Sequence, residues 1–479
     1  MFFNSLNYAF FLPIIFICYW FFSFKSYRIQ NIQLLLASYV FYAFWDWRFL
    51  FLLMFSTLLD YFTGLQIHAS TSKQNKRIWL TISVITNLGF LCFFKYYNFF
   101  SSSFAILLGH FGLISHASTL SLILPVGISF YTFHGLSYVF DIYNEKIKPR
   151  TNIIDYSLFV SFFPLLVAGP IERATHLLPQ VEKPRTFDYS KTLNGLRQIL
   201  WGLFKKMVIA DNCAEIANKI FDHSTPYNGS ALAIGAIFFS FQIYGDFSGY
   251  TDIALGTARL LGFELLQNFS YPYFSRDIAE FWRRWHISLS SWFRDYLYYP
   301  LGGSRGGKWQ KIRNTFIIFL VSGFWHGANW TFVAWGAFHA ICFLPLLLFN
   351  RNRSNIEIVA KGRVFPSIKD IFNMSLTFSL ITIGLVIFRS NSIPDAFHFI
   401  RGIASRSFFQ IPNLNMPWSL IFVLMVFIFI EWCGREAEFA ISKIPDSWPR
   451  IVRWFFYYAL IFAIFYCTGN VHQFIYFQF

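Results

Sequence analysis

The chain has 479 residues, of which 56% are hydrophobic, 22% aromatic and only 13% charged. A soluble protein of average composition carries about 25% charged residues, so this composition excludes an ordinary soluble domain and indicates a polytopic membrane protein. The net charge of +15 comes from lysines and arginines in short loops between apolar segments, a pattern typical of topology signals and of contacts with anionic membrane lipids. No nucleic-acid-binding motif is recognisable, which excludes nucleic acid as a partner.

Apolar stretches recur along the whole chain. A spanning helix needs about 20 mainly apolar residues, and the fold class that we predict is an all-α bundle of about 11 to 12 transmembrane helices with re-entrant and interfacial helices. The N-terminal stretch lacks the features of a cleaved signal peptide, so we expect a retained first span. The predicted spans lie near residues 7–24, 31–46, 48–67, 79–98, 120–140, 193–212, 231–245, 314–330, 331–349, 371–389, 418–433 and 454–470.

The distribution of positive charge predicts the orientation of these spans. Lys25 and Arg28 follow the first span, which places the N-terminus outside the cytoplasm by the positive-inside rule. Alternation from there leaves both termini outside. The stretches then predicted on the cytoplasmic side are all basic: 71–78, 141–155, 350–369 and 434–453.

Two regions depart from this pattern. Residues 156–170 are apolar but contain Pro164 and Gly169-Pro170, which predicts a kinked or re-entrant segment. Residues 246–313 contain no clean spanning stretch, and from Arg276 to Arg313 they carry eight Lys/Arg against three Asp/Glu. We expect this region at the cytoplasmic face of a single domain over residues 1–479, with its core at about 120–340.

The stretch 277–299 contains the first candidate histidine. Asp277 and Glu280 resemble a capping box, and the aromatic residues that follow recur at helical spacing, which predicts one interfacial amphipathic helix. His286 lies in its middle. The helix either anchors the protein at lipid headgroups, with an incidental histidine, or lines a site for an anionic donor, with His286 turned inward.

Two other polar clusters carry weaker signals. Residues 302–308 match the spacing of a phosphate-binding P-loop, but Trp309 replaces the metal-binding Ser/Thr and no strand precedes, so we interpret them as a basic loop. Asp246 and Asp252 follow an apolar segment and are six residues apart, so they do not face each other on a helix. Capping and satisfaction of buried backbone groups are their expected roles. The six cysteines show no metal-binding spacing, and we predict no metal site.

His326 is the strongest single candidate. It lies in FWHGANW, residues 324–330, within a long apolar stretch where ionisable groups are costly and usually functional. Fourteen residues of helix from Ile312 would place it roughly 21 Å along the span. A desolvated imidazole stays neutral, and the neutral form can accept a proton from a hydroxyl or thiol. A hydrogen-bonded structural histidine is the competing interpretation, and His134 and His339 are weaker candidates.

Several motifs together resemble the membrane-bound O-acyltransferase (MBOAT) family, and in particular its alginate O-acetylation branch. They occur in the family's order and cover about the middle half of the chain. The motifs are LPVGISFYTFHGLSYVFDIY (124–143), FFPLLVAGPIER (162–173), residues 244–303 including FWRRWHISLSSWFRDYLYYPLGG, and FWHGANWTFVAWG (324–336).

This resemblance implies that His326 is the catalytic histidine and that His286 is a second functional histidine. It also implies a thin core pierced by a central channel. In this branch an acetyl group passes from a cytoplasmic thioester, acetyl-CoA, to an extracytoplasmic polysaccharide such as alginate, with separate extracytoplasmic acetyl-transfer proteins, at the bacterial inner membrane. Acetyl-CoA is then a substrate, and no permanently bound cofactor is expected. Further candidates for substrate binding or channel lining are Trp325, Asn329, Trp330, Arg283, Arg284, Asp246 and His134.

The chemistry of the residues is compatible with these implications. The basic 276–313 region would attract an anionic thioester, and a histidine can deprotonate a hydroxyl and then protonate a leaving thiolate. No GxSxG elbow is present, which argues against a serine-hydrolase mechanism. Whether an acyl-enzyme forms is left open, as is the choice among alginate, peptidoglycan, cellulose and other glycans.

Three other functions are compatible with parts of the sequence. The related branch that exports D-alanine from a carrier-protein thioester to teichoic acid is the alternative enzyme. A polysaccharide transporter should show paired inverted halves with interrupted helices, which we do not find. A scaffold that only holds partner enzymes would leave His326 and His286 dispensable.

Overall fold

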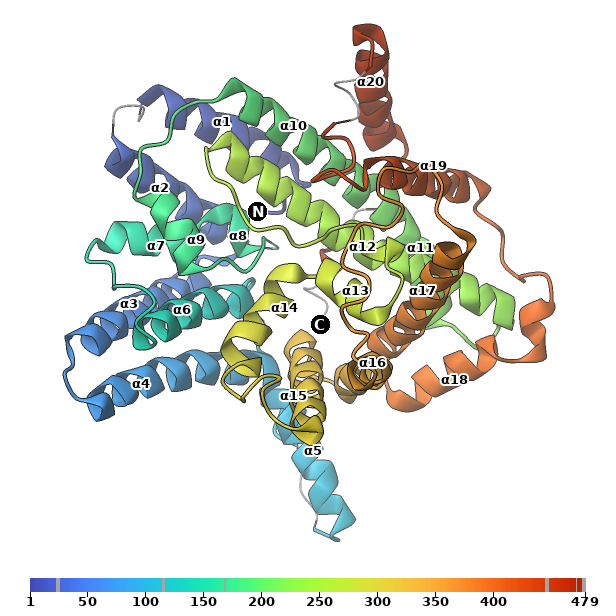
Figure 1. Ribbon diagram of the computed structural model, residues 1–479, viewed down its shortest axis with the longest axis horizontal. Coiled ribbons are helices and arrows are strands. Elements are labelled where there is room, and N and C mark those ends of the chain that lie inside the picture. The colour runs from blue at the N-terminus through green and yellow to red at the C-terminus, as the bar shows by residue number, and fades with distance from the viewer. Residues whose placement is uncertain (23–25, 114–116, 168, 444–447, 471, 476–479) are drawn as a thin grey trace. The chain divides into compact units, whose positions relative to one another are not determined.

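The computed structural model describes residues 1–22, 26–113, 117–167, 169–443, 448–470 and 472–475 (Figure 1). Every regular element among them is helical, which confirms the predicted all-α class. Contacts divide the chain into two compact units, Met1–Thr192 with Thr257–Leu266, and Leu193–Gly256 with Gln267–Phe479. The single domain with a core at about 120–340 stays a prediction.

The first unit begins with helices close to the predicted spans. The boundary predicted between the spans 31–46 and 48–67 is confirmed, since α2 ends at Asp46, α3 begins at Arg48, and these two side chains form a 2.6 Å ion pair. Its elements are α1 (Leu6–Phe22), α2 (Tyr27–Asp46), α3 (Arg48–Ala69), α4 (Lys73–Leu91), the π-helical turn η1 (Cys92–Tyr96), α5 (Tyr97–His110), α6 (Ile128–Tyr143), α7 (Ile153–Ser161), α8 (Phe163–Leu166) and α9 (Ala174–Val181).

The kink predicted within residues 156–170 is confirmed. Helix α7 ends at Ser161, Phe162 leaves the helical region with φ −55° and ψ 113°, and the short α8 follows. Pro164 lies in the first turn of α8, where its missing N–H costs no helical hydrogen bond. Both segments are buried, so irregular backbone is shielded by protein.

The second unit holds the two histidines singled out above. Its elements are α10 (Tyr189–Leu203, which starts in the first unit), the π-helical η2 (Phe204–Ala210), α11 (Asp211–Asp222), α12 (Gly229–Leu260, which ends in the first unit), η3 (Pro272–Phe274), α13 (Ile278–Arg284), α14 (Ile287–Phe293), the π-helical η4 (Arg294–Tyr298), α15 (Lys308–His326), α16 (Trp330–Leu348), α17 (Ile368–Arg389), α18 (Ile393–Ile403), η5 (Arg406–Phe409), α19 (Trp418–Gly434) and α20 (Arg450–Tyr466).

Helix α12 is much longer than the predicted span 231–245. Asp246 and Asp252 do not end it, because both lie within the continuous helix Gly229–Leu260. Two neighbouring lysines of η2 neutralise them: Lys205 pairs with Asp252, and Lys206 pairs with Asp246 at 2.8 Å. A buried carboxylate is tolerated in a helix when a cation pairs with it. The predicted helix end, and with it the capping role of these aspartates, was therefore wrong.

The single amphipathic helix predicted over 277–299 was also wrong. The chain breaks at Trp285 and His286, so that α13, α14 and η4 follow one another as short segments. The predicted start is confirmed, because Asp277 caps α13 by accepting a 2.7 Å hydrogen bond from the Glu280 N–H. The aromatic side is buried in protein instead of lying at the membrane surface: Phe281, Trp285, Leu289 and Trp292 are at most 7% exposed.

Five helical segments of the described chain are long and apolar enough to cross a membrane: Arg48–Ala69, Lys73–His110, Gly229–Leu260, Trp330–Leu348 and Ile368–Arg389. Two shorter apolar helices are Leu6–Phe22 and Trp418–Gly434. The other predicted spans overlap helices that are shorter or more polar, and the one predicted at 120–140 is helical only from Ile128 onward. The number of 11 to 12 spans therefore stays a prediction. The protein is nevertheless a multi-pass membrane protein by its repeated apolar helices.

Candidate functional site

The helical hairpin α15–α16 places His326. Helix α15 ends at His326, and Gly327 and Ala328 turn the chain before Asn329 caps α16 by accepting a 3.1 Å hydrogen bond from the Thr331 N–H. The two helices pack side by side (Figure 1). His326 is therefore fixed at the end of α15 by a tight connection, close to the predicted end of this span at residue 330.

Two glycines allow this hairpin to close. A Cβ atom at Gly323 would lie 2.2 Å from the carbonyl oxygen of Phe332, and one at Gly336 would lie 2.3 Å from that of Phe319. Each glycine thus contacts the backbone of the opposite helix, an approach that is typical of small residues in membrane helix pairs.

Aromatic rings surround His326, which is 4% exposed. Its ring centroid is 4.9 Å from Trp325, 5.1 Å from Trp335 and 5.6 Å from Phe388. A narrow cavity of about 10 Å³ borders His326 and His339 and has room for about one water molecule. Trp325, Trp335 and Phe388 make these surroundings largely apolar.

His286 lies at the break between α13 and α14. Its backbone is left-handed, with φ 43° and ψ 54°, a conformation uncommon for a residue other than glycine. Its side chain is 1% exposed, and its ring lies 4.7 Å from Phe247 and 5.9 Å from Trp325. The ring centroids of His286 and His326 are 6.5 Å apart, so the structure brings the two candidate histidines together.

Asn268 holds this break in place. Its backbone oxygen accepts a 3.0 Å hydrogen bond from the Ile287 N–H, and its side-chain oxygen accepts a 2.6 Å hydrogen bond from the Ser288 hydroxyl. Asn268 is fully buried. Asn268, which lies outside α14, therefore holds Ile287 and Ser288 in place. These two hydrogen bonds stabilise the energetically unfavourable left-handed backbone of His286.

Burial lowers the pKa of His286 from its ordinary value of 6.5 to about 3. The imidazole is therefore neutral at physiological pH. A neutral imidazole can accept a proton or a hydrogen bond, which is the form that general base catalysis requires.

The arginines beside His286 are bound to protein groups. Glu280 is 1% exposed and pairs with Arg284 at 2.9 Å and with Arg276 at 3.0 Å. Arg283 is exposed and donates 2.7 Å hydrogen bonds to the carbonyl oxygens of Asn352 and Asn355. The two candidates for donor binding, Arg283 and Arg284, therefore hold the 350–357 loop and the start of α13.

The other candidate residues lie in different surroundings. Asp246 accepts a 2.6 Å hydrogen bond from the Ile475 N–H and pairs with Lys206, which in turn pairs with Asp211 at 2.7 Å. His134 belongs to the first unit, is fully buried, and accepts a 3.1 Å hydrogen bond from the Glu172 N–H. Both arrangements satisfy buried groups.

Trp325, Asn329 and Trp330 have three different positions. The Trp325 ring contacts both His286 and His326 and lies beside the histidine pair. Asn329 caps α16 and also donates a 2.9 Å hydrogen bond to the Asn391 carbonyl oxygen. Trp330 is 56% exposed, in contrast to the buried histidine pair.

The sequence did not single out Asn268, Trp282 or Trp335. Trp335 and His339 are four residues apart on α16, a spacing that places both rings on one helix face. Their centroids are 4.9 Å apart, and Trp282 lies 5.1 Å from His339 and 5.6 Å from Trp335. That spacing was a usable signal, whereas Asn268 occurs in no pattern that distinguishes it.

The chain is similar to known proteins over most of its length. Residues 144–388, which include both histidines, match the model of the membrane-bound O-acyltransferase family (MBOAT). A probable alginate O-acetylase of Pseudomonas aeruginosa is 39% identical over 389 residues, covering 81% of this chain and 72% of the relative. A peptidoglycan O-acetyltransferase of Helicobacter pylori is 36% identical over 439 residues, covering 85% of this chain and 80% of the relative.

A more distant relative is a teichoic acid D-alanyltransferase of Bacillus subtilis, 28% identical over 281 residues, with 56% of this chain and 69% of the relative covered. The family match covers more than half of the chain, and relatives above 30% identity cover most of it. The chain therefore belongs to the membrane-bound O-acyltransferase family and is an O-acyltransferase.

Proposed function

We propose that this enzyme transfers an acetyl group from acetyl-CoA on the cytoplasmic side to a hydroxyl group of an extracytoplasmic polysaccharide. The observation that carries the proposal is the pair of buried histidines, His286 and His326, with ring centroids 6.5 Å apart inside the family-matched region. The names of the relatives, an alginate O-acetylase and a peptidoglycan O-acetyltransferase, support acetyl as the group and a glycan as the acceptor.

The distance between the histidines suits one reacting group. A hydrogen bond to imidazole is about 3 Å long, so one hydroxyl group between the rings can reach both. His326 takes the proton from the attacking hydroxyl as the new C–O bond forms. The C–S bond of the thioester then breaks, and the same imidazole returns the proton to the leaving thiolate. His286 orients the donor or shares this proton transfer.

The length of α15 supports a role for His326 in bridging the two sides. Lys308 begins the helix and His326 ends it, about 27 Å further along the axis. With the predicted cytoplasmic location of Lys308, the imidazole lies toward the outer face. A channel through the protein then has to carry the donor thioester most of this way.

We further propose that separate extracytoplasmic acetyl-transfer proteins complete the transfer to the polysaccharide, and that the enzyme resides in a bacterial inner membrane among anionic lipids. The bacterial sources of the relatives support this location. Acetyl-CoA acts as a substrate throughout, and the scheme uses no bound cofactor.

The experiment that tests the proposal uses sealed proteoliposomes with radiolabelled donor on one side only. We expect label to leave acetyl-CoA when it is supplied on the side of the basic loops, and to be lost in His326→Ala and His286→Ala. His398→Ala, at an exposed histidine of α18, is the matched control and should retain activity.

A parallel reaction supplies a D-alanyl carrier-protein thioester. Label released from this donor and not from acetyl-CoA would replace the proposed donor with that of the teichoic acid branch. Equal activity in all three variants would overturn the roles of both histidines.

A further inference from the structure

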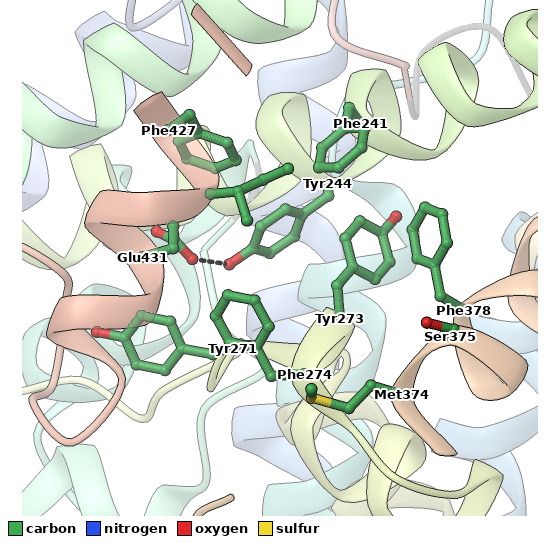
Figure 2. Close-up of a pocket in the computed structure, with 11 residues that line it drawn as sticks. Phe241, Tyr244, Tyr271, Tyr273, Phe274, Met374, Ser375, Phe378, Phe427 and Glu431 are labelled. Atoms are coloured by element: carbon green, nitrogen blue, oxygen red, sulfur yellow. Dashed lines mark hydrogen bonds between the residues drawn. The ribbon is translucent and has the colours of Figure 1, made fainter. Parts of the chain in front are cut away.

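The second unit contains a cavity of about 310 Å³ between α12, η3, α17 and α19 (Figure 2). Its walls are largely aromatic and include Phe241, Tyr244, Phe274, Met374, Phe378 and Phe427. This volume is about ten times that of one water molecule in the liquid. We call it the aromatic cavity.

The polar groups of the aromatic cavity are already bonded to protein. The Tyr244 hydroxyl donates a 2.6 Å hydrogen bond to the Glu431 carboxylate, drawn as a dashed line in Figure 2, and the Trp201 indole N–H donates to the other oxygen at 3.2 Å. The Tyr271 hydroxyl donates to the Ala437 carbonyl oxygen at 3.2 Å. Among the described residues that line the cavity, none is basic. Its chemistry therefore suits an uncharged apolar group and repels an anionic one.

The helices at the edge of the aromatic cavity have apolar outer faces. On α17, Phe372 is 67% exposed and Leu376 is 51% exposed, while Phe422 and Phe429 of α19 are equally accessible. Ser375 of α17 lines the cavity and is itself exposed. In a membrane protein such faces contact lipid, so hydrocarbon chains are the molecules available at this edge.

One side of the aromatic cavity leads to a basic segment. Phe274 lies 5.2 Å from Trp432, whose indole N–H donates a 2.8 Å hydrogen bond to the Val364 carbonyl oxygen. The exposed Lys361, Arg363 and Lys369 lie on either side of Val364 and at the start of α17. We call these three residues the basic edge. Lysines and arginines at a membrane surface attract anionic headgroups.

We propose that the aromatic cavity and the basic edge together bind one anionic membrane phospholipid. A hydrocarbon chain occupies the cavity, and the phosphate-containing headgroup stays outside at the basic edge. This division follows from the two linings, because the cavity is lined mainly by apolar and aromatic side chains and by no basic one among the described residues, whereas the basic edge attracts an anion.

The bound chain would contact the support of the catalytic centre. Tyr273, another wall residue, stacks on Trp285 with centroids 6.1 Å apart, and Trp285 also lines the small cavity beside His326. Trp285 directly precedes His286. Tyr273 and Trp285 would thus lie between the bound hydrocarbon chain and the histidine pair.

The test uses the purified full chain in phosphatidylcholine nanodiscs that contain a small fraction of phosphatidylglycerol with a diazirine on one acyl chain. After illumination, mass spectrometry maps the labelled residues. We expect label at Phe274, Met374 and Phe378. Ser375→Trp should fill the cavity and abolish most of this labelling, whereas Leu376→Trp, on the neighbouring lipid-facing position, should leave it unchanged.

The headgroup is tested with the same lipid probe. Each of Lys361→Gln, Arg363→Gln and Lys369→Gln should lower the labelling by about fivefold, since each basic residue contributes about 1 kcal/mol near the surface. A phosphatidylcholine probe should label the cavity less than the phosphatidylglycerol probe does. Labelling that is unchanged in Ser375→Trp would show that the cavity is not the binding site. Equal labelling by both probes would show that the site does not select an anionic headgroup.

Discussion

At the scale of single residues, a strained backbone conformation positions His286, and residues that contact it from elsewhere in the chain stabilise that conformation. A left-handed conformation at a bulky residue is unfavourable, so something outside the local sequence has to stabilise it. Asn268 does this by bonding both Ile287 and Ser288. The imidazole is thereby directed into the space beside Trp325 and His326.

We predict that Asn268→Ala lowers the free energy of unfolding by about 1–3 kcal/mol, because the buried Ser288 hydroxyl loses its acceptor. Thermal unfolding in detergent measures this. In a double-mutant cycle, Ser288→Ala should cost much less in the Asn268→Ala background than in the wild type. Strictly additive effects would show that the hydrogen bond does not hold the break.

The depressed pKa of His286 predicts a pH dependence of stability. Because the folded-state pKa of about 3 lies below the ordinary value of 6.5, the folded protein binds this proton less readily than the unfolded chain does. The corresponding stability is fully present above pH 6.5 and is lost as the pH falls from 6.5 toward 3. Unfolding midpoints of the wild type should therefore fall more steeply in this window than those of His286→Gln. Parallel curves would contradict the buried neutral state.

The candidate site was predictable from the sequence to the extent that its residues carry rare chemistry. His326 and His286 were recognisable because histidine is unusual in apolar surroundings and both lie in family motifs. Asn268 was not, because asparagine in a polar loop has many roles and its contacts depend on the fold. Arg283 and Arg284 stay predicted substrate-binding or channel-lining residues, and their bonds to Asn352 and Glu280 were not visible in the local sequence.

At the scale of helices, close contacts between backbones position the site. The α15–α16 hairpin depends on Gly323 and Gly336, each of which lies against a carbonyl oxygen of the other helix. His326 ends α15, so any separation of the two helices moves the imidazole relative to Trp335.

We expect Gly323→Ala and Gly336→Ala each to destabilise the protein by about 1–3 kcal/mol, as overpacking does, and to reduce acyl transfer. Gly307→Ala is the matched control, because a Cβ there meets nothing within 4 Å. Unfolding and transfer assays on the same preparations measure both effects. Unchanged stability in all three variants would show that the hairpin tolerates a wider separation.

Sequence patterns did not predict two of the helix boundaries. The aspartates of α12 were expected to end a helix, but lysines about forty residues earlier, Lys205 and Lys206, neutralise them within it. The helical periodicity of residues 277–299 was real, yet the chain breaks at His286 because tertiary contacts outweigh periodicity. Helix ends marked by local chemistry, such as Asp46–Arg48 and the Asp277 cap, were predicted correctly.

At the scale of the whole molecule, charge and apolar length predicted the class and the orientation. Five described helical segments meet the criteria for spanning, and further apolar helices coincide with the other predicted spans. The predicted orientation across the membrane rests only on the distribution of basic residues among the loops.

We predict that Arg353→Cys, in a background without the six native cysteines, reacts with an impermeant maleimide only from the cytoplasmic side. Ile411→Cys, in the exposed segment between α18 and α19, should react only from the opposite side. Labelling of right-side-out and inverted vesicles measures this. Labelling of both positions from one side would reverse or abolish the proposed path of the acetyl group.

The most direct test of the central claim is acetyl transfer from acetyl-CoA by His326→Gln in sealed proteoliposomes, beside the wild type and His398→Gln at equal amounts of folded protein. Glutamine keeps a neutral polar side chain but cannot carry the proton. Loss of a general base should lower the rate by about 10²- to 10⁴-fold, with His398→Gln near the wild type. A His326→Gln enzyme that transfers acetyl at the wild-type rate would contradict the assignment of His326 as the catalytic residue.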